Sequence, residues 1–515
     1  MRKFVVFGTL FACVAIASGA SWAQSGKENK PETLLRWQFA GTKQIANVKD
    51  LNSFREIFSL PETSALRVAA AQHFAGHAAR RFTKGGDTNA NAAIMRIIQP
   101  LLPDLWMDES SFLMTAQGPE DTDWFLALNI DAVRSEEWSK ALSELAKAAG
   151  MQGAGMPSGN SSWTAQKDKY RLSFSRAKDW TVIEGGHGAA DAKLAREFRS
   201  DLGKRRAKQL LVADVNSPLL GRIWNSETLA HAPKLTVRAE PKGDGIRSEL
   251  TMDYPQDLGI KAEKWNVPTG LITEPLIGFT AIQGIEKRLA MNEKFKALGA
   301  GKTPNQVYLW SLAYNPFMIY LAADVKNSAQ VVTNAARALQ NAKLPTGSIA
   351  LSTNRPIMIW NGLPVKPFLE MAAEPHSSFV RAGLFPLQIA TNKPAPAELF
   401  AQLNKKNLIY YEWEVTGVRL GKFSPIWQLY YLASQMVTRN DSASEKWIQA
   451  AEKHLGNTVT EGTLESSRRI KLVRQSQLGL NSVELLLLAH LLDDGDLFAR
   501  SAAGPRPVPA APAPR

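Results

Sequence analysis

Cysteine is almost absent from this sequence. The only one among 515 residues is Cys13, which lies within an apolar run over residues 4–17. If the chain is cleaved after Ala23, the mature protein contains no cysteine. Disulfides, thiolate metal sites and cysteine nucleophiles are then excluded.

Long apolar runs and short catalytic signatures are also scarce. The most apolar later stretch, residues 308–323, is divided by Asn315 and Pro316 into two pieces of strand length. We therefore expect no transmembrane helix in the mature chain. No G-x-S-x-G pattern occurs, which removes a common serine-hydrolase signature. A catalytic triad dispersed along the chain stays open, so catalytic residues are unknown at this point.

The N-terminus has the three parts of a secretory signal peptide. Arg2 and Lys3 precede the apolar run over residues 4–17, and a small-x-small sequence ends at Ala23. This pattern predicts a signal peptide over residues 1–23 and export to the periplasm or the medium.

Two alternatives to a cleaved signal peptide stay open. A membrane anchor would need roughly 20 apolar residues, which is more than this run provides. A lipid anchor on Cys13 would need a lipoprotein cleavage site, and the bulky Phe11 disfavours one.

The chain is basic. Its formal charge is +13, and the mature chain carries +11 because residues 1–23 contain Arg2 and Lys3 and no acid. This charge suits an anionic envelope polymer or another envelope protein as a partner, but a basic solvated surface is the explanation we favour. We expect no nucleic acid partner, because the basic run over residues 193–208 includes a single aromatic residue, Phe198.

Strand and helix patterns alternate along the chain. Residues 317–342 contain an apolar run that ends at Asp324, a polar corner and an apolar stripe at helical spacing, which predicts a strand, a turn and a helix. Residues 125–148 show the same succession. We therefore predict an α+β fold of two halves built from repeated strand-helix-strand units, with mostly antiparallel sheets packed against helices. The expected domains are residues 24–240 and 241–500, followed by a disordered Pro/Ala-rich tail over 501–515.

Four aspartates stand near the ends of predicted strands. They are Asp50, Asp131, Asp214 and Asp324, each a few residues before a Ser or Asn that can start a helix. Carboxylates gathered at strand ends can bind a ligand. A turn residue ahead of a helix N-cap needs the same placement, and we interpret them in that way.

Two motifs approach the spacing of known ligand sites. His73 and His77 lie one turn apart on a predicted helix and can share a metal, but a zinc peptidase would need Glu where this chain has Phe74. Residues 299–303 end like a phosphate-binding loop, but Lys296 replaces its first glycine, so a helix end is expected. The sequence therefore assigns no metal site and no cofactor.

Glycines, acids and tryptophans offer three weaker candidates. Gly185, Gly186, His187 and Gly188 can cradle an anion, but without the dinucleotide-binding spacing we expect a turn. The acidic residues 493–496 lack the spacing of a calcium loop and are interpreted as a solvated helix end. The 14 tryptophans can stack on sugars where exposed, but their strand and helix patterns predict burial.

One C-terminal stretch carries a family resemblance. It consists of Val473, Arg474, Gln475, Ser476, Gly479 and Glu484. Together with the exported, two-halved arrangement, it resembles a family of uncharacterised exported bacterial proteins. The resemblance covers most of the chain and includes no catalytic motif, so it implies a compartment and a style of fold but no activity.

These observations favour a non-enzymatic function. We predict an exported binding or structural protein of the bacterial cell envelope. The alternative is a hydrolase with dispersed catalytic residues that acts on envelope polymers or peptides. Carriage of an anionic or apolar ligand in the periplasm is a third hypothesis.

Overall fold

The computed structural model describes residues 31–494 except for 84–86, 119–120, 154–161, 188–191, 205–208, 224, 343–347, 353, 355, 363–364, 387–392 and 434–441. The predicted signal peptide and the predicted tail lie outside this range. The chain divides into two compact units. Unit 1 comprises Met1–Ile246, Tyr430–His454 and Val483–Arg515, and unit 2 comprises Arg247–Leu429 and Leu455–Ser482.

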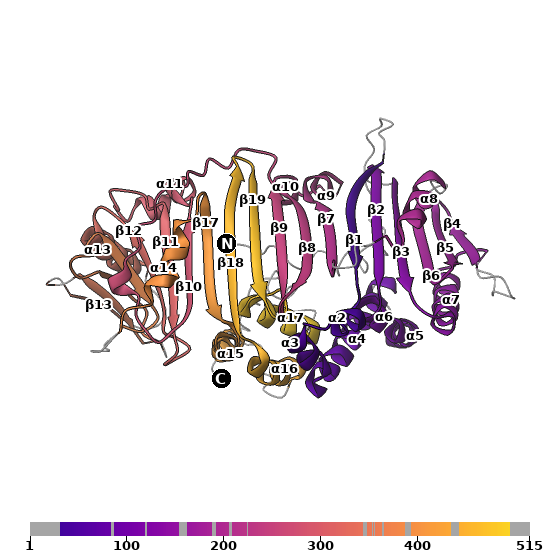
Figure 1. The fold of residues 1–515 in the computed structure, drawn as a ribbon. Helices are drawn as coiled ribbons and strands as arrows, with labels where there is room; N and C mark the ends of the chain where they lie inside the picture. The colour runs from indigo at the N-terminus through magenta and orange to yellow at the C-terminus, as the bar shows by residue number, and fades with distance from the viewer. Residues whose placement is uncertain are drawn as a thin grey trace, which may run out of the picture. The chain divides into compact units, whose positions relative to one another are not determined.

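The strands of unit 1 pair in the order β4-β5-β6-β3-β2-β1-β7-β8, all antiparallel (Figure 1). Their bounds are β1 Glu32–Phe39, β2 Ser110–Gly118, β3 Asp121–Asn129, β4 Ser162–Lys167, β5 Tyr170–Ala177, β6 Trp180–His187, β7 Leu211–Asn216 and β8 Lys234–Lys242. Side chains alternate between the two faces of a strand. On β3, Leu126 and Leu128 join one buried cluster, whereas Phe125 and Ala127 join another. Both faces of this part of the sheet are therefore covered.

The helices of unit 1 supply this cover and a separate helical group. Their bounds are α2 Thr42–Ala46, α3 Asn52–Ser59, α4 Pro61–Phe82, α5 Thr88–Ile98, η1 Gln99–Leu101, α6 Leu102–Met107, α7 Ala132–Ala148, α8 Ala192–Asp201, α9 Ser217–Ile223, α10 Glu227–Ala230, α16 Ala443–Ala451, η4 Glu452–His454 and α17 Ser482–Asp493. Trp138 of α7 packs on one face of the sheet and Phe198 of α8 on the other. Helices α2, α4, α5 and α6 gather beyond one end of β1, β2 and β3 (Figure 1).

The strands of unit 2 pair in the order β9-β19-β18-β17-β10-β11-β12-β16-β15-β14-β13, again antiparallel. Their bounds are β9 Gly245–Asp253, β10 Leu276–Gln283, β11 Gln306–Leu312, β12 Ile319–Asp324, β13 Ser348–Ser352, β14 Ile357–Asn361, β15 Phe368–Met371, β16 Phe379–Gly383, β17 Leu408–Val415, β18 Asn457–Ser466 and β19 Arg469–Ser476. The helices are η2 Thr269–Leu271, α11 Glu286–Ala290, α12 Glu293–Lys296, α13 Ser328–Asn341, α14 Ala397–Ala401, η3 Gln402–Asn404 and α15 Thr416–Ala433.

The predicted fold class is wrong in its central feature. We expected two halves built from repeated strand-helix-strand units with sheets of their own, whereas hydrogen bonds link the described strands into one 19-stranded antiparallel sheet. Sequence periodicity identifies a strand but not its partner, because each strand edge is satisfied by whichever backbone the tertiary fold brings to it. The β1–β7 and β10–β17 pairs join segments that are far apart in the chain. The domain bounds at 24–240 and 241–500 stay predictions.

Several predictions of local secondary structure are confirmed. Over residues 317–342, β12 ends at Asp324 and α13 begins at Ser328, which confirms the strand, turn and helix. Asp131 is the N-cap of α7, and its carboxylate accepts from the backbone N–H of Arg134 at 2.8 Å. That aspartate therefore has the structural role expected at a helix start, but it is itself the N-cap and not a turn residue ahead of one. No described helix combines the length and the apolar character needed to span a bilayer.

A buried network of charges joins β17 to α15 in unit 2. The Glu414 carboxylate is fully buried and accepts from Arg419 Nη1 at 2.6 Å and from the backbone N–H and hydroxyl of Ser482, both at 2.7 Å. Arg419 Nη1 also donates to Glu412 at 3.2 Å. Asn481 Nδ2 donates to the other oxygen of Glu412 at 3.0 Å. The Arg419 guanidinium thus pairs with two buried carboxylates. Each carboxylate also accepts hydrogen bonds from Asn481 or Ser482.

Replacement of Arg419 by methionine should destabilise the protein strongly. The variant keeps the volume of the side chain but leaves two carboxylates buried without their cation, which costs about 3–5 kcal/mol of unfolding free energy. The measurement is the urea midpoint followed by near-ultraviolet circular dichroism. Lys405→Met is the control, because Lys405 pairs with Glu461 at the surface, where such pairs contribute about 0–1 kcal/mol. Equal midpoints for the two variants would contradict the assignment.

Candidate functional site

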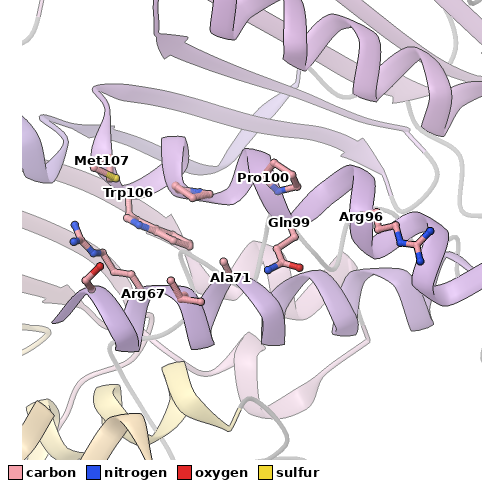
Figure 2. A pocket seen from close by; sticks show the side chains of 10 residues that line it. Arg67, Ala71, Arg96, Gln99, Pro100, Trp106 and Met107 are labelled. Atoms are coloured by element: carbon pink, nitrogen blue, oxygen red, sulfur yellow. The ribbon is translucent and has the colours of Figure 1, made fainter. Parts of the chain in front are cut away.

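A surface groove in unit 1 lies between α4 and the segment made of α5, η1 and α6 (Figure 2). Its volume is about 550 Å³, which lies in the range of small-molecule sites. Most of its lining is apolar and consists of Val68, Ala71, Pro100, Pro103, Trp106 and Met107. Val68 is 54% exposed although it is apolar, so the groove presents a hydrophobic surface to solvent.

Small side chains let the two walls approach each other. Ala70, Ala71 and Ala75 are buried on one face of α4, and Met95 and Trp106 from the opposite wall pack against the same cluster. Interhelical distance depends on the side chains at the contact, so alanines favour close packing. The floor of the groove is therefore well packed.

Polar contacts hold both walls in place. On the α6 side, the buried carboxylate of Asp104 accepts from Trp138 Nε1 and from Arg134 Nη2, each at 2.7 Å. On the α4 side, Trp447 Nε1 of α16 donates to the hydroxyl of Thr63 at 3.0 Å. The groove is consequently built on anchored helices, as expected of a preformed binding site.

Two arginines line the groove without a carboxylate partner among the described residues. The Arg67 guanidinium lies 4.6 Å from the ring centroid of Phe58, a cation–π contact. Burial lowers the pKa of Arg67, but an arginine remains protonated near neutral pH. Arg96 is exposed. Figure 2 shows Arg67, Trp106 and Met107 at one end of the groove and Arg96 at the other.

Two further polar groups are available along the groove. Ser64 and Gln99 contribute a hydroxyl and an amide. The indole N–H of Trp106 has no hydrogen-bond acceptor among the described residues, but it is covered from solvent and is not presented to a ligand in the groove. The lining contains neither a carboxylate nor a histidine.

A second cluster in unit 1 brings serine, histidine and carboxylates together. The Ser444 hydroxyl lies 2.9 Å from Asp493 Oδ2 and 3.2 Å from His490 Nδ1. His490 Nε2 lies 3.6 Å from Glu445 Oε1. Burial lowers the pKa of His490 to about 4, with a smaller opposing effect from Asp493 and Asp494. The imidazole is therefore neutral at pH 7, and its contact with Glu445 is not an ion pair there.

The geometry of this cluster does not suit nucleophilic catalysis. A hydroxyl can donate only one hydrogen bond, and Ser444 donates it to Asp493. The same carboxylate also accepts from the Ser444 backbone N–H at 3.2 Å. The serine oxygen then accepts from His490 Nδ1, so that nitrogen is a donor where a triad requires a base. Ser444 is also only 1% exposed. These contacts tie α16 to α17.

The histidine pair expected on one helix does lie on α4. Phe74 between the two histidines is buried. No group of three or more potential metal ligands occurs among the residues that the structure describes. The turn formed by residues 299–303 follows α12, and Gly299 and Gly301 adopt positive φ, which confirms a helix end and loop.

The turn expected at Gly185 and Gly186 is wrong. Both glycines lie inside β6, where an added Cβ would collide with Trp124 and Asp123 of β3. Without a Cβ, the two glycines leave room for the Trp124 and Asp123 side chains to lie over the β6 backbone. Gly188 lies outside the described residues.

The acidic residues, the basic run and the tryptophans make structural contacts wherever the structure describes them. Asp493 accepts from Ser444, while residues 495 and 496 lie outside the described range. On the basic helix α8, Phe198 is buried and Arg199 pairs with Glu184. No tryptophan with a described side chain is exposed, in agreement with core use.

Sequence reasoning missed both the groove and the serine–histidine cluster. Arg67 and Arg96 belong to different helices, and neither stands in a short motif. Ser444 and His490 are 46 residues apart. The sequence gives no short-range signal for either site, because each is made of residues from separate segments.

Neutral His490 should make stability depend on pH. Its folded pKa of about 4 lies below the ordinary value of 6.5, so its contribution is complete above pH 6.5 and is lost as the pH falls toward 4. The loss for the wild type is about 3 kcal/mol relative to a variant without this histidine. Urea midpoints of wild type and His490→Gln at pH 7.5 and pH 4.5 test this difference.

The exposed His231 supplies the control for this experiment. His231→Gln should keep the pH dependence of the wild type, since this exposed side chain lies outside the cluster of Ser444 and His490. If His490→Gln and the wild type lose stability in parallel on acidification, the neutral buried imidazole is refuted.

Comparisons with known proteins return no relative that would indicate an activity. No family model, no curated protein and no solved structure matches the chain. The resemblance drawn from residues 473–484 therefore stays a prediction.

Proposed function

We propose that this protein is an exported, non-enzymatic binding protein of the bacterial cell envelope whose ligand occupies the groove between α4 and α6. The observation that carries the proposal is the combination of an exposed apolar surface with the Arg67 cation, which has no carboxylate partner among the described residues. Surfaces of this kind are typical of binding sites. The signal-peptide pattern of residues 1–23 supports export.

The composition of the groove supports binding over catalysis. Nucleophilic or acid–base chemistry needs a base beside the nucleophile, and the lining contains no histidine or carboxylate next to Ser64. The alternative function, a hydrolase with dispersed catalytic residues, finds its best candidate in Ser444 and His490. Their burial and the direction of their hydrogen bonds count against it.

A carboxylate introduced into the groove should weaken ligand binding. Val68→Glu puts a carboxylate beside Arg67 at an exposed position, so the fold is retained while apolar contact and free cation are both lost. We expect at least a tenfold weaker affinity for the anionic apolar dye 1-anilinonaphthalene-8-sulfonate in a fluorescence titration, since one lost ion contact is worth about 1.5–3 kcal/mol.

Val133→Glu is the matched control. Val133 is 68% exposed on α7 and does not line the groove, so this variant should bind the dye like the wild type. Identical dye affinities for wild type, Val68→Glu and Val133→Glu would show that the groove is not the binding site.

A further inference from the structure

The arrangement of charge and apolar surface along the groove indicates a class of ligand. We propose that the groove binds a free, single-chain aliphatic carboxylate, with the carboxylate at Arg67 and the chain extending along α4 toward Arg96. This inference rests on the proposed function, since it names the ligand of the same site.

The position of the anionic end follows from the two arginines. Arg67 is half-buried beside apolar residues and aromatic Phe58, whereas Arg96 is exposed to solvent. An anion gains most from a cation that is partly withdrawn from water, because Coulomb attraction grows as the local dielectric falls. A guanidinium also matches the two oxygens of a carboxylate with two parallel donors.

The direction of the chain follows from the lining. Beyond Arg67, the groove continues past Ala71 and Pro100 toward Arg96 (Figure 2). These side chains offer contact without hydrogen-bond acceptors, which suits methylene groups. The volume of about 550 Å³ lies in the range of small-molecule sites.

The charge of Arg67 adds a second requirement on the headgroup. Arg67 supplies a cation and hydrogen-bond donors at its end of the groove (Figure 2). A carboxylate accepts from this guanidinium, whereas an ammonium headgroup would repel it. The site is therefore selective for an anion over a cation of equal chain length.

Isothermal titration of the mature protein with octanoate, decanoate and dodecanoate, below their micelle concentrations, tests the proposal. Affinity should rise about two- to fourfold for each added methylene, as partial to full burial of that group predicts. Decanol and decylamine should bind at least tenfold more weakly than decanoate. A flat chain-length series, or equal binding of all three decyl compounds, would overturn the inference.

Substitutions of the two arginines test which of them binds the carboxylate headgroup. Arg67→Gln should remove the preference for decanoate over decanol, whereas the conservative Arg67→Lys should retain part of it because the charge persists. Arg96→Gln at the other end should have a smaller effect than Arg67→Gln. The matched control is Arg196→Gln on α8, an exposed arginine that does not line the groove, and it should change decanoate affinity less than twofold. A larger effect of Arg96→Gln than of Arg67→Gln would reverse the proposed orientation and contradict the inference.

Two further measurements, vesicle competition and dye displacement, show whether the ligand class or the proposed function is wrong. Vesicles that contain phosphatidylglycerol should not compete with decanoate, since the proposed ligand is a free amphiphile. Competition by vesicles without decanoate binding would identify a membrane surface as the ligand and refute this inference. If the dye binds the groove but no carboxylate displaces it, only the ligand class fails; if the dye does not bind the groove, the proposed function fails as well.

Discussion

Backbone hydrogen bonding between distant strands is the constraint on which the rest of this structure depends. A buried strand edge must find a partner, and here β1 is enclosed by β2 and β7 while β10 is enclosed by β11 and β17. These central strands bring together segments that the sequence separates widely. The helices then attach wherever the resulting sheet leaves apolar side chains uncovered, as on both faces of β3.

Buried carboxylates in this protein stabilise the packing of helices and strands when each of them has a cationic partner and further hydrogen-bond donors. Glu412 and Glu414 share Arg419, and Asp104 is satisfied by Arg134 and Trp138. A desolvated charge with such a set of donors is locked in one state and adds specificity to the packing. The same reasoning applies to the cluster around Ser444 and His490, whose hydrogen bonds are directed inward.

The groove differs from these clusters because its charge is not compensated. Arg67 faces apolar side chains and an aromatic ring, and no carboxylate of the described residues neutralises it. A cation in these surroundings is costly for the protein alone and favourable once an anion arrives. A cation without a carboxylate partner among the described residues is what distinguishes this groove from the buried ion pairs.

The sequence by itself determined the local structure. Apolar periodicity and a capping carboxylate specify β12, α13 and the start of α7, because these depend on residues within a few positions of one another. Only the tertiary structure decided the pairing of β1 with β7, the burial of Gly185 beneath Trp124 and the meeting of Arg67 with Trp106 across two helices. Strand partners and groove walls are chosen by long-range contacts whose energies are summed over the whole fold, and no short pattern records them.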